Sequence, residues 1–373
     1  MAYFNFSTVK PTGWWERRSF VRAWWKIYSD DPRWAPPDYS AWYRLVVRME
    51  ADFWRRTGAQ PIYMEALPHR RPQANSSVYQ PALGGAVFEE PVAAAVLQCA
   101  PDRQETAYLA MLHCVNDEET LDRLLATTLD TAFDRGCTRV VGPTGPVPSW
   151  ASGALINAFD ALPPGQTPYN PPYLADLLRT SMTVCLESAL LHVPVSDCLD
   201  AQGPALLAPL DLTTLDDDLL SLLDMALSPH CLAPGVASDE LRLLLKWLAV
   251  SPLTGWQAQI DGVPVGLALV QPDLAPLMRR TRGGRTLPWR WYAAWAKHRP
   301  ALRGRLLLGA VSPPWRRQGI GRQLLAQVLR HATVAGWREL VCGPYVTPSA
   351  AVEFFLRAGA VERQRYELFE WNG

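Results

Sequence analysis

The chain has 373 residues, more than one hydrophobic core usually holds, so two domains are expected. Nearly half of the residues are apolar (49%), but no run of about 18 apolar residues and no amino-terminal signal pattern occur, which predicts a cytoplasmic protein without a membrane span. The 36 basic and 36 acidic side chains balance, which disfavours nucleic acid as a partner, and the seven cysteines and six histidines lack metal-site spacing.

Sequence patterns predict a mixture of strands and helices in the first half of the chain. The predicted elements are a hairpin near residues 86–99, a strand at 107–113, a helix at 118–133, a strand at 138–141 and a closing strand at 182–191. Residues 191–204 are rich in Pro, Gly and Asp. This segment predicts the boundary between a first domain at 1–195 and a second domain at 205–373.

The second half repeats this mixture and predicts an α/β fold with a mixed sheet. Its strongest local signal is the turn dipeptide Asp261-Gly262 between two apolar runs. The predicted elements are a strand at 205–210, a helix through Met225, a helix at 239–250, hairpin strands at 255–260 and 265–270, a strand at 305–311, a helix at 319–335, a strand at 339–342, a helix at 349–357 and a strand at 366–371. The same fold class is expected for both halves.

A basic, glycine-containing turn stands between a predicted strand and a predicted helix in the second half. The first amides of a helix lack partners within the helix and point outward, and the helix dipole adds partial positive charge. Gly319 and Gly321 let phosphate oxygens approach these amides, and Arg316, Arg317 and Arg322 add charge. The turn therefore predicts a pyrophosphate site. A dinucleotide fingerprint and a P-loop are both missing, so coenzyme A is the expected nucleotide.

This turn, the Val311-x-Pro313 step before it and the later Phe354-Phe355-x-x-x-Gly359 segment resemble the GNAT superfamily of acyl-CoA N-acyltransferases, over residues 205–373. In that family the turn holds the coenzyme A pyrophosphate, and the end of the preceding strand contacts pantetheine and thioester. The resemblance implies acetyl-CoA as co-substrate without a metal. The implied coenzyme-binding residues are Ala310, Val311, Arg316, Arg317, Gln318, Gly319, Ile320, Gly321, Arg322 and Phe355.

The first half resembles the same superfamily more loosely, through the segments at residues 28–37 and 169–173. Where the phosphate turn is expected, residues 116–119 hold three carboxylates and no glycine. These acids repel a pyrophosphate, and they are favourable at a helix start. The resemblance thus implies a tandem GNAT arrangement in which the first domain is degenerate and does not bind the coenzyme.

The family's direct transfer of an acyl group to an amine needs a neutral amine and a protonated or stabilised leaving thiolate. Two family positions differ here, because Phe355 replaces a proton-donating tyrosine and Pro348 replaces an asparagine. The strand at 305–311 also carries no carboxylate to act as a base. Tyr345 and Glu353 are the candidate catalytic residues, although Tyr345 could simply cap the sheet, Glu353 could face solvent, and water or substrate could act instead.

The connection at residues 272–300 is unusually long for a link between two strands. Nine basic residues and one acid occur from Asp273 to Arg305. We expect this insertion to border the acceptor side of the cleft and to favour an acceptor that carries a carboxylate or phosphate besides its amine. Its aromatic residues, Trp289, Trp291, Tyr292 and Trp295, could line a substrate cleft as an acceptor-side lid or stack on nucleic acid, but packing against a neighbouring element is the expected role.

The predicted activity is N-acetyl transfer from acetyl-CoA to an amine of a small molecule or peptide. Neither nucleic acid nor a membrane is an expected partner. Phe355 and the missing strand carboxylate leave a second hypothesis open: a non-catalytic acyl-CoA-binding or scaffold protein built from degenerate GNAT domains. The sequence specifies neither the acceptor nor the oligomeric state.

Overall fold

The computed structural model describes residues 5–10, 14–48, 54–55, 57–67, 90–99, 105–147, 150, 152–195, 201–211, 217–227, 241, 245 and 252–372. The strands of the first half are β1 (Asn5–Val9), β2 (Gln60–Leu67), β3 (Glu90–Cys99), β4 (Thr106–Cys114), β5 (Arg139–Thr144), β6 (Ala154–Leu155) and β7 (Thr183–Pro194). Its helices are α1 (Trp14–Ile27), α2 (Tyr39–Tyr43) with the π-helical turn η1 (Arg44–Arg48), α4 (Glu118–Phe133) and α5 (Tyr173–Ser181).

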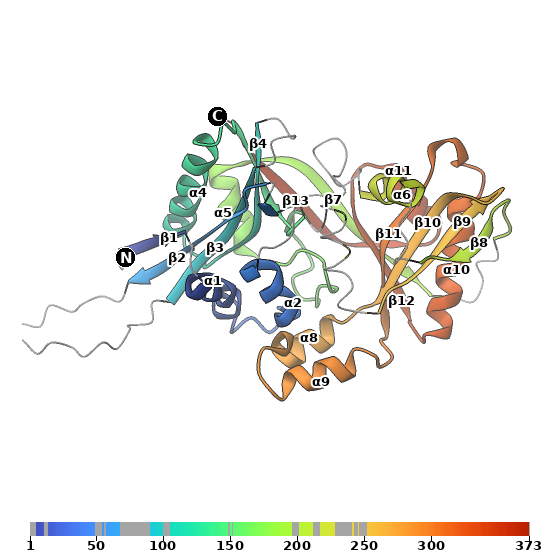
Figure 1. Ribbon diagram of the computed structural model, residues 1–373, viewed down its shortest axis with the longest axis horizontal. Helices are drawn as coiled ribbons and strands as arrows, with labels where there is room; N and C mark the ends of the chain where they lie inside the picture. Colours follow the sequence, from blue (N-terminus) through green and yellow to red (C-terminus); the bar gives the residue numbers. More distant parts are fainter. Residues whose placement is uncertain are drawn as a thin grey trace, which may run out of the picture.

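The second half begins with β8 and ends with β13. Its strands are β8 (Leu206–Pro209), β9 (Thr254–Ile260), β10 (Val263–Pro272), β11 (Arg303–Val311), β12 (Glu339–Val346) and β13 (Val361–Asn372). Its helices are α6 (Asp217–Leu227), α8 (Ala275–Thr281), η4 (Arg282–Gly284), α9 (Trp289–Ala296), η5 (Pro313–Trp315), α10 (Ile320–Val334) and α11 (Ala350–Arg357). Figure 1 shows the first half on the left and most of the second half on the right.

One continuous sheet joins the two halves. Its strand order is β1-β2-β3-β4-β5-β13-β7-β12-β11-β10-β9-β8, and β6 pairs with β13. The last strands of the two halves, β7 and β13, pair with each other near the middle of the molecule (Figure 1).

Each half gives its last strand to the other half. β13 of the second half pairs with β5 of the first, and β7 of the first half pairs with β12 of the second, both antiparallel. Neither half therefore holds a complete sheet made only of its own strands. The ranges 1–195 and 205–373 describe the two halves of the chain and remain our proposal for its domains.

Helices cover both faces of this sheet. Ala94 of β3 and Leu267 of β10 belong to one core with α1, α2 and α6. The next residues along the same strands, Ala95 and Ala268, point to the opposite face, where α4 and α5 cover the first half and α10 and α11 cover the second. Successive side chains of a strand point to opposite faces, so a strand buried on both faces reads as a continuous apolar run.

The mixed α/β class expected from the sequence is confirmed. Helix α4 has the predicted bounds, and the β9–β10 turn adopts left-handed φ angles of 52° at Asp261 and 81° at Gly262. The predicted helix at 239–250 lies mostly outside the described residues, within which Leu241 and Leu245 are helical. Residues 86–89 of the predicted hairpin at 86–99 also lie outside them.

Candidate functional site

Strands β11 and β12 separate at the end of β11 that leads into the basic turn. They pair in parallel from Arg303 opposite Glu339 to Leu306 opposite Cys342. On its other edge, β11 stays paired with β10 as far as Val311. Beyond Leu306, β11 and β12 therefore no longer pair with each other. Ala310 and Val311, two implied coenzyme contacts, lie on this part of β11 and are half-buried.

The turn after β11 folds back on the end of the strand. Arg316 Nε donates to the carbonyl oxygen of Val311 at 3.0 Å. Gly319 precedes α10 with a left-handed φ of 88°, and a Cβ added there would meet nothing within 4 Å. Glycine is thus required at this position by backbone conformation rather than by lack of space.

The backbone amides of residues 317–322 form an open row at the start of α10. No backbone hydrogen bond among the described residues uses them, and the first such bond of the helix joins Gln323 N to Gly319 O at 2.9 Å. Arg316, Arg317 and Arg322 are exposed around this row. Unpartnered amides, the positive end of the helix dipole and three guanidinium groups together suit a polyanion such as the pyrophosphate of coenzyme A.

Three further residues that the resemblance implies for the coenzyme site lie in or next to the turn. Gln318 Nε2 donates to Pro314 O at 3.0 Å, so that side chain holds the turn. Ile320 is buried in the core beneath α10, which leaves its amide for a ligand. A Cβ at Gly321 would lie 3.6 Å from the Phe354 ring, an ordinary contact, so the fold itself tolerates a side chain there.

The structure brings Tyr345 and Phe355 together. Their rings stack with centroids 5.4 Å apart and an interplanar angle of 9°. Burial raises the pKa of Tyr345 well above 10, which keeps its phenol protonated at neutral pH, while the nearby charge of Arg305 acts in the opposite direction. Tyr345 is 9% exposed. The phenol beside the separated strands therefore carries its proton at neutral pH, which is the state a proton donor needs.

Glu353 is placed differently from Tyr345. Its side chain is 65% exposed and forms an i,i+4 ion pair with Arg357 at 2.9 Å along α11. The buried positions of α11 are Val352 and Phe355 instead. The geometry therefore favours Tyr345 over Glu353 as a participant in the chemistry.

Arg305 has a position that sequence reasoning did not single out. This guanidinium is fully buried within β11, and its Nη2 donates to Gly343 O at 3.0 Å. Its Nε and Nη1 have no hydrogen-bond partner among the described residues. Burial lowers the pKa of Arg305 from its usual 12.5. A signal that could have found it is an arginine followed directly by the apolar run of β11, because a charge on a buried strand is rarely buried without a partner or a role.

The start of α4 differs from the start of α10. Asp117 caps α4 by accepting from Thr120 N at 2.9 Å and from Thr120 Oγ1 at 2.6 Å. Glu118 and Glu119 are exposed in the first turn, and Glu119 pairs with Arg123. A side-chain carboxylate therefore occupies the helix end that would face a pyrophosphate, so this end does not suit the coenzyme.

The insertion at residues 272–300 lies at the end of β11 remote from the phosphate turn, and its place on the acceptor side of the cleft stays a prediction. It joins the end of β10 to the start of β11, where Pro272 pairs with Gly304. The phosphate turn follows Val311 at the opposite end of β11, roughly 25 Å away at about 3.3 Å per residue. In Figure 1, α8 and α9 extend below the sheet toward the first half. The expected packing of its tryptophans is wrong, since Trp291 is 72% exposed and Trp295 is 55% exposed.

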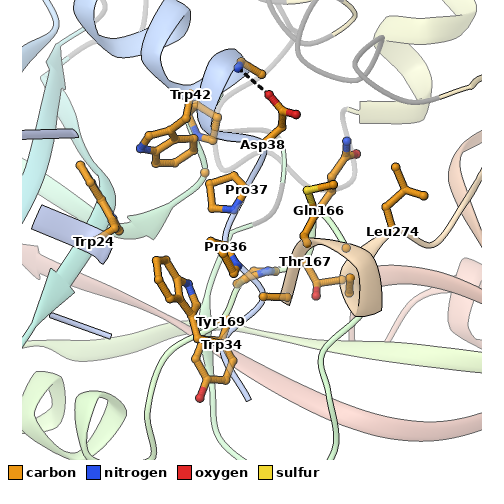
Figure 2. A pocket seen from close by; sticks show the side chains of 18 of the residues that line it. Trp24, Trp34, Pro36, Pro37, Asp38, Trp42, Gln166, Thr167, Tyr169 and Leu274 are labelled. Carbon is orange, nitrogen blue, oxygen red and sulfur yellow. Dashed lines mark hydrogen bonds between the residues drawn. The ribbon is translucent and has the colours of Figure 1, made fainter. Parts of the chain in front are cut away.

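A cavity of about 490 Å³ lies between the insertion and the first half of the chain, and we call it the N-terminal pocket. It is lined by Met111 to His113 of β4, by the chain from Pro143 to Pro146, by residues of α1 and α2, and by residues of α8 and α9. Figure 2 shows the aromatic and proline side chains along one wall and the polar Gln166 and Thr167 opposite.

An internal repeat could have located this pocket from the sequence. Gly142-Pro143 in β5 and Gly343-Pro344 in β12 follow similar apolar residues, and both strands lie next to a parallel partner from which they separate. The segments at 28–37 and 169–173, which supported the resemblance of the first half, also contribute to the wall through Trp34 and Tyr169.

The described residues include neither a membrane-spanning helix nor a metal-ligand cluster. No helix among them is long and apolar enough to cross a membrane. Within the same residues, no group of three or more His, Cys, Asp or Glu side chains is arranged to hold a metal ion.

Comparison with known proteins supports one fold for the whole chain. Residues 221–360 match the model of the Acetyltransferase (GNAT) family. No curated protein sequence matches the chain. Among solved structures, a tandem GNAT protein from the clavulanic acid biosynthesis pathway superposes with a TM-score of 0.58 at 13% identity, over 99% of this chain and 98% of that chain.

Two other structures agree with it. A GCN5-related N-acetyltransferase from Sphaerobacter thermophilus has a TM-score of 0.53 at 13% identity, over 98% of this chain and 95% of that chain. A probable N-acyltransferase from Enterococcus faecalis V583 has a TM-score of 0.56 at 7% identity, over 99% and 73%. At these identities the similarity concerns the fold, which is common to all three.

Proposed function

From the tandem GNAT-type acyltransferase fold of this chain, we propose that it is an N-acetyltransferase with one acetyl-CoA site, in its second half. The observation that carries the proposal is the open row of amides at residues 317–322, with three exposed arginines around it. Acetyl-CoA supplies an activated thioester when it is bound. The corresponding helix end of the first half is filled by Asp117, so that half is proposed to lack coenzyme binding.

The residues of the second half divide the work of binding. The amides and arginines of the turn hold the pyrophosphate. Ala310 and Val311 lie on the part of β11 that does not pair with β12, and the free backbone edge there binds the pantetheine. Phe355 supports the site from α11 and is held against Tyr345. Fixing the reactants in one geometry accounts for much of the rate gain of such transfers.

Tyr345 is the proposed proton donor. In the direct reaction, a neutral amine forms the new C–N bond, the C–S bond breaks, and the leaving sulfur must take up a proton. The raised pKa keeps the Tyr345 proton in place until then, and the charge of Arg305 nearby stabilises the phenolate that remains. No carboxylate lies on β11, so water or the substrate is proposed to receive the amine's proton.

Calorimetry of the full chain tests the binding part of the proposal. Titration with acetyl-CoA is expected to give one site per chain. Asp117→Ala in the first half should not change this stoichiometry, since it creates no glycine turn and no basic cluster. Two equivalent sites in the unaltered chain would contradict the assignment of the first half.

A non-catalytic acyl-CoA-binding protein is the second candidate function. Phe355 in place of the family's tyrosine and the absence of carboxylates from β11 favour it. Free-thiol release from acetyl-CoA across a panel of amines separates the two candidates. Amine-dependent release supports the enzyme, whereas saturable binding without release for every amine supports the binding protein.

A further inference from the structure

The N-terminal pocket lies where β4 and β5 separate, on the sheet face covered by α1 and α2. The two strands pair from Thr106 opposite Arg139 to Ala110 opposite Thr144, with an irregularity between Tyr108 and Ala110. Protein interiors are packed with few voids larger than a water molecule, so a cavity of about 490 Å³ is not a packing defect. Its volume is that of pockets which bind drug-sized ligands.

Aromatic rings form one wall of the pocket. Trp24, Trp34 and Trp42 are each less than 10% exposed and all line it (Figure 2). The indole N–H of Trp24 is buried without a hydrogen-bond partner among the described residues, and so is Nδ1 of His113. Burial lowers the pKa of His113 well below 6.5, so its ring is neutral at pH 7. A flat apolar group that offers a polar atom would match this wall.

The second half contributes to the opposite wall through the insertion, which is held firmly in place. Trp25 Nε1 donates to Arg282 O at 2.9 Å. A Cβ on Gly283, whose φ is 69°, would lie 2.3 Å from Pro37 O, so η4 and the first half touch through their backbones. Gly165 N donates to Asp273 Oδ1 at 2.7 Å. The pocket is thus formed before any ligand enters, which reduces the entropic cost of binding.

The charged side chains of the pocket are mostly basic. Arg44, Arg290 and Lys297 line it, and the last two come from α9 and its end. Asp38 is the acidic lining residue, and its carboxylate already accepts from Ala41 N at 2.9 Å as the cap of α2 (Figure 2). Arg290 forms no ion pair with any residue that the structure describes. The basic rim therefore favours an anionic ligand.

This pocket is remote from the phosphate turn of the coenzyme site. It adjoins Pro272 at the end of β10, whereas the phosphate turn follows Val311 at the far end of β11, roughly 25 Å away at about 3.3 Å per residue. The helix that starts next to the pocket's own strand β4 is capped by Asp117, which disfavours a pyrophosphate. Coenzyme A is therefore not the expected occupant.

We propose that the N-terminal pocket is a second ligand site, which binds a small molecule with a flat aromatic or apolar body and one carboxylate or phosphate. The body packs on the tryptophan wall, and the anion lies toward Arg290 and Lys297. The two halves of the chain build the site jointly.

Calorimetry with aryl anions tests this proposal on the full chain. The probes are 1-naphthaleneacetate and 1-naphthyl phosphate, with uncharged 1-naphthaleneacetamide as the comparison. At least one anion is expected to bind at one site per chain and about tenfold more tightly than the amide. The two anions distinguish a carboxylate site from a phosphate site.

Variants show where the anion binds. Reversal of both charges in Arg290→Glu/Lys297→Glu should raise the Kd of the better anion by about tenfold or more. Arg279→Glu on α8, an exposed residue outside the pocket, is the matched control and should change the Kd by less than about twofold. Ala293→Trp fills the pocket from α9 and should abolish binding.

Several outcomes would overturn the proposal. These are no saturable binding of either anion, equal affinity for the amide, and an affinity unaffected by the double charge reversal. Displacement of the anion by coenzyme A, or loss of its binding in Gly321→Glu, would place it in the coenzyme site. Because the reversed residues are exposed or half-buried, the double variant is expected to fold even where Ala293→Trp does not.

Discussion

Gly321→Glu is expected to weaken acetyl-CoA binding about a hundredfold while leaving the fold intact. For a carboxylate about 6 Å from the two charges of a pyrophosphate, with an effective dielectric constant of about 40 at this exposed helix end, the repulsion is roughly 3 kcal/mol. A loss of that size raises the Kd about a hundredfold. Exposed charges are screened by salt, so the effect should shrink as ionic strength rises.

The stability of this variant should move in the opposite direction. Replacing a helical glycine by glutamate gains about 0.5 kcal/mol of helix propensity, and an acid in the first turn gains about 0.3–1 kcal/mol from the dipole. The added Cβ meets Phe354 at 3.6 Å and Val311 at 3.8 Å, which are ordinary contact distances. Thermal unfolding should therefore show an unchanged or slightly raised Tm.

Gly321→Gln is the matched control, because it has the same size without the charge. Calorimetry of the three proteins separates the steric effect, seen in both variants, from the electrostatic effect, seen only with Glu. Equal losses in both variants would refute the electrostatic argument. An unchanged Kd in folded Gly321→Glu would remove the phosphate site from the start of α10.

Three further predictions concern catalysis, the junction between the halves and acid stability. Tyr345→Phe should lower kcat by about a hundredfold with an unchanged acetyl-CoA Kd, whereas Glu353→Gln should retain activity; equal kcat in both would exclude Tyr345 as the proton donor. The fully buried carboxylate of Asp273 pairs with Arg303 and accepts from two backbone amides. In Asp273→Ala, urea unfolding should show that the free energy of unfolding falls by about 3 kcal/mol, and a fall under about 1 kcal/mol would contradict this role. The pKa of Glu339 in the folded protein lies below its usual 4.5, first because of its hydrogen bond with His192. The stability contributed by the ionised Glu339 is therefore complete above about pH 4.5 and is lost as the pH falls through its folded-state pKa. The unfolding free energy should thus fall less steeply between about pH 5 and 3 in Glu339→Gln than in the unaltered chain, and identical slopes would count against the bond.

Features encoded by neighbouring residues could be predicted from the sequence. Helix α4 matched its predicted bounds because its acidic start and apolar period lie within one segment. The turn before α10 was found because the strand, the glycines and the helix follow one another along the chain. The acids at 116–119 were read correctly as a helix start for the same reason.

Tertiary structure decided which strands pair and what the insertion covers. The apolar alternation of β7 and β13 is the same whether each strand pairs within its own half or with the other half. The sequence pattern therefore did not show that the two halves exchange these strands. The sequence shows that the insertion joins β10 to β11, but not that it packs against the first half of the chain. Its real position depends on contacts between residues far apart in the chain, such as Gly283 against Pro37, which only the folded chain brings together. The N-terminal pocket and the burial of Arg305 also depend on contacts between residues that are far apart in the chain.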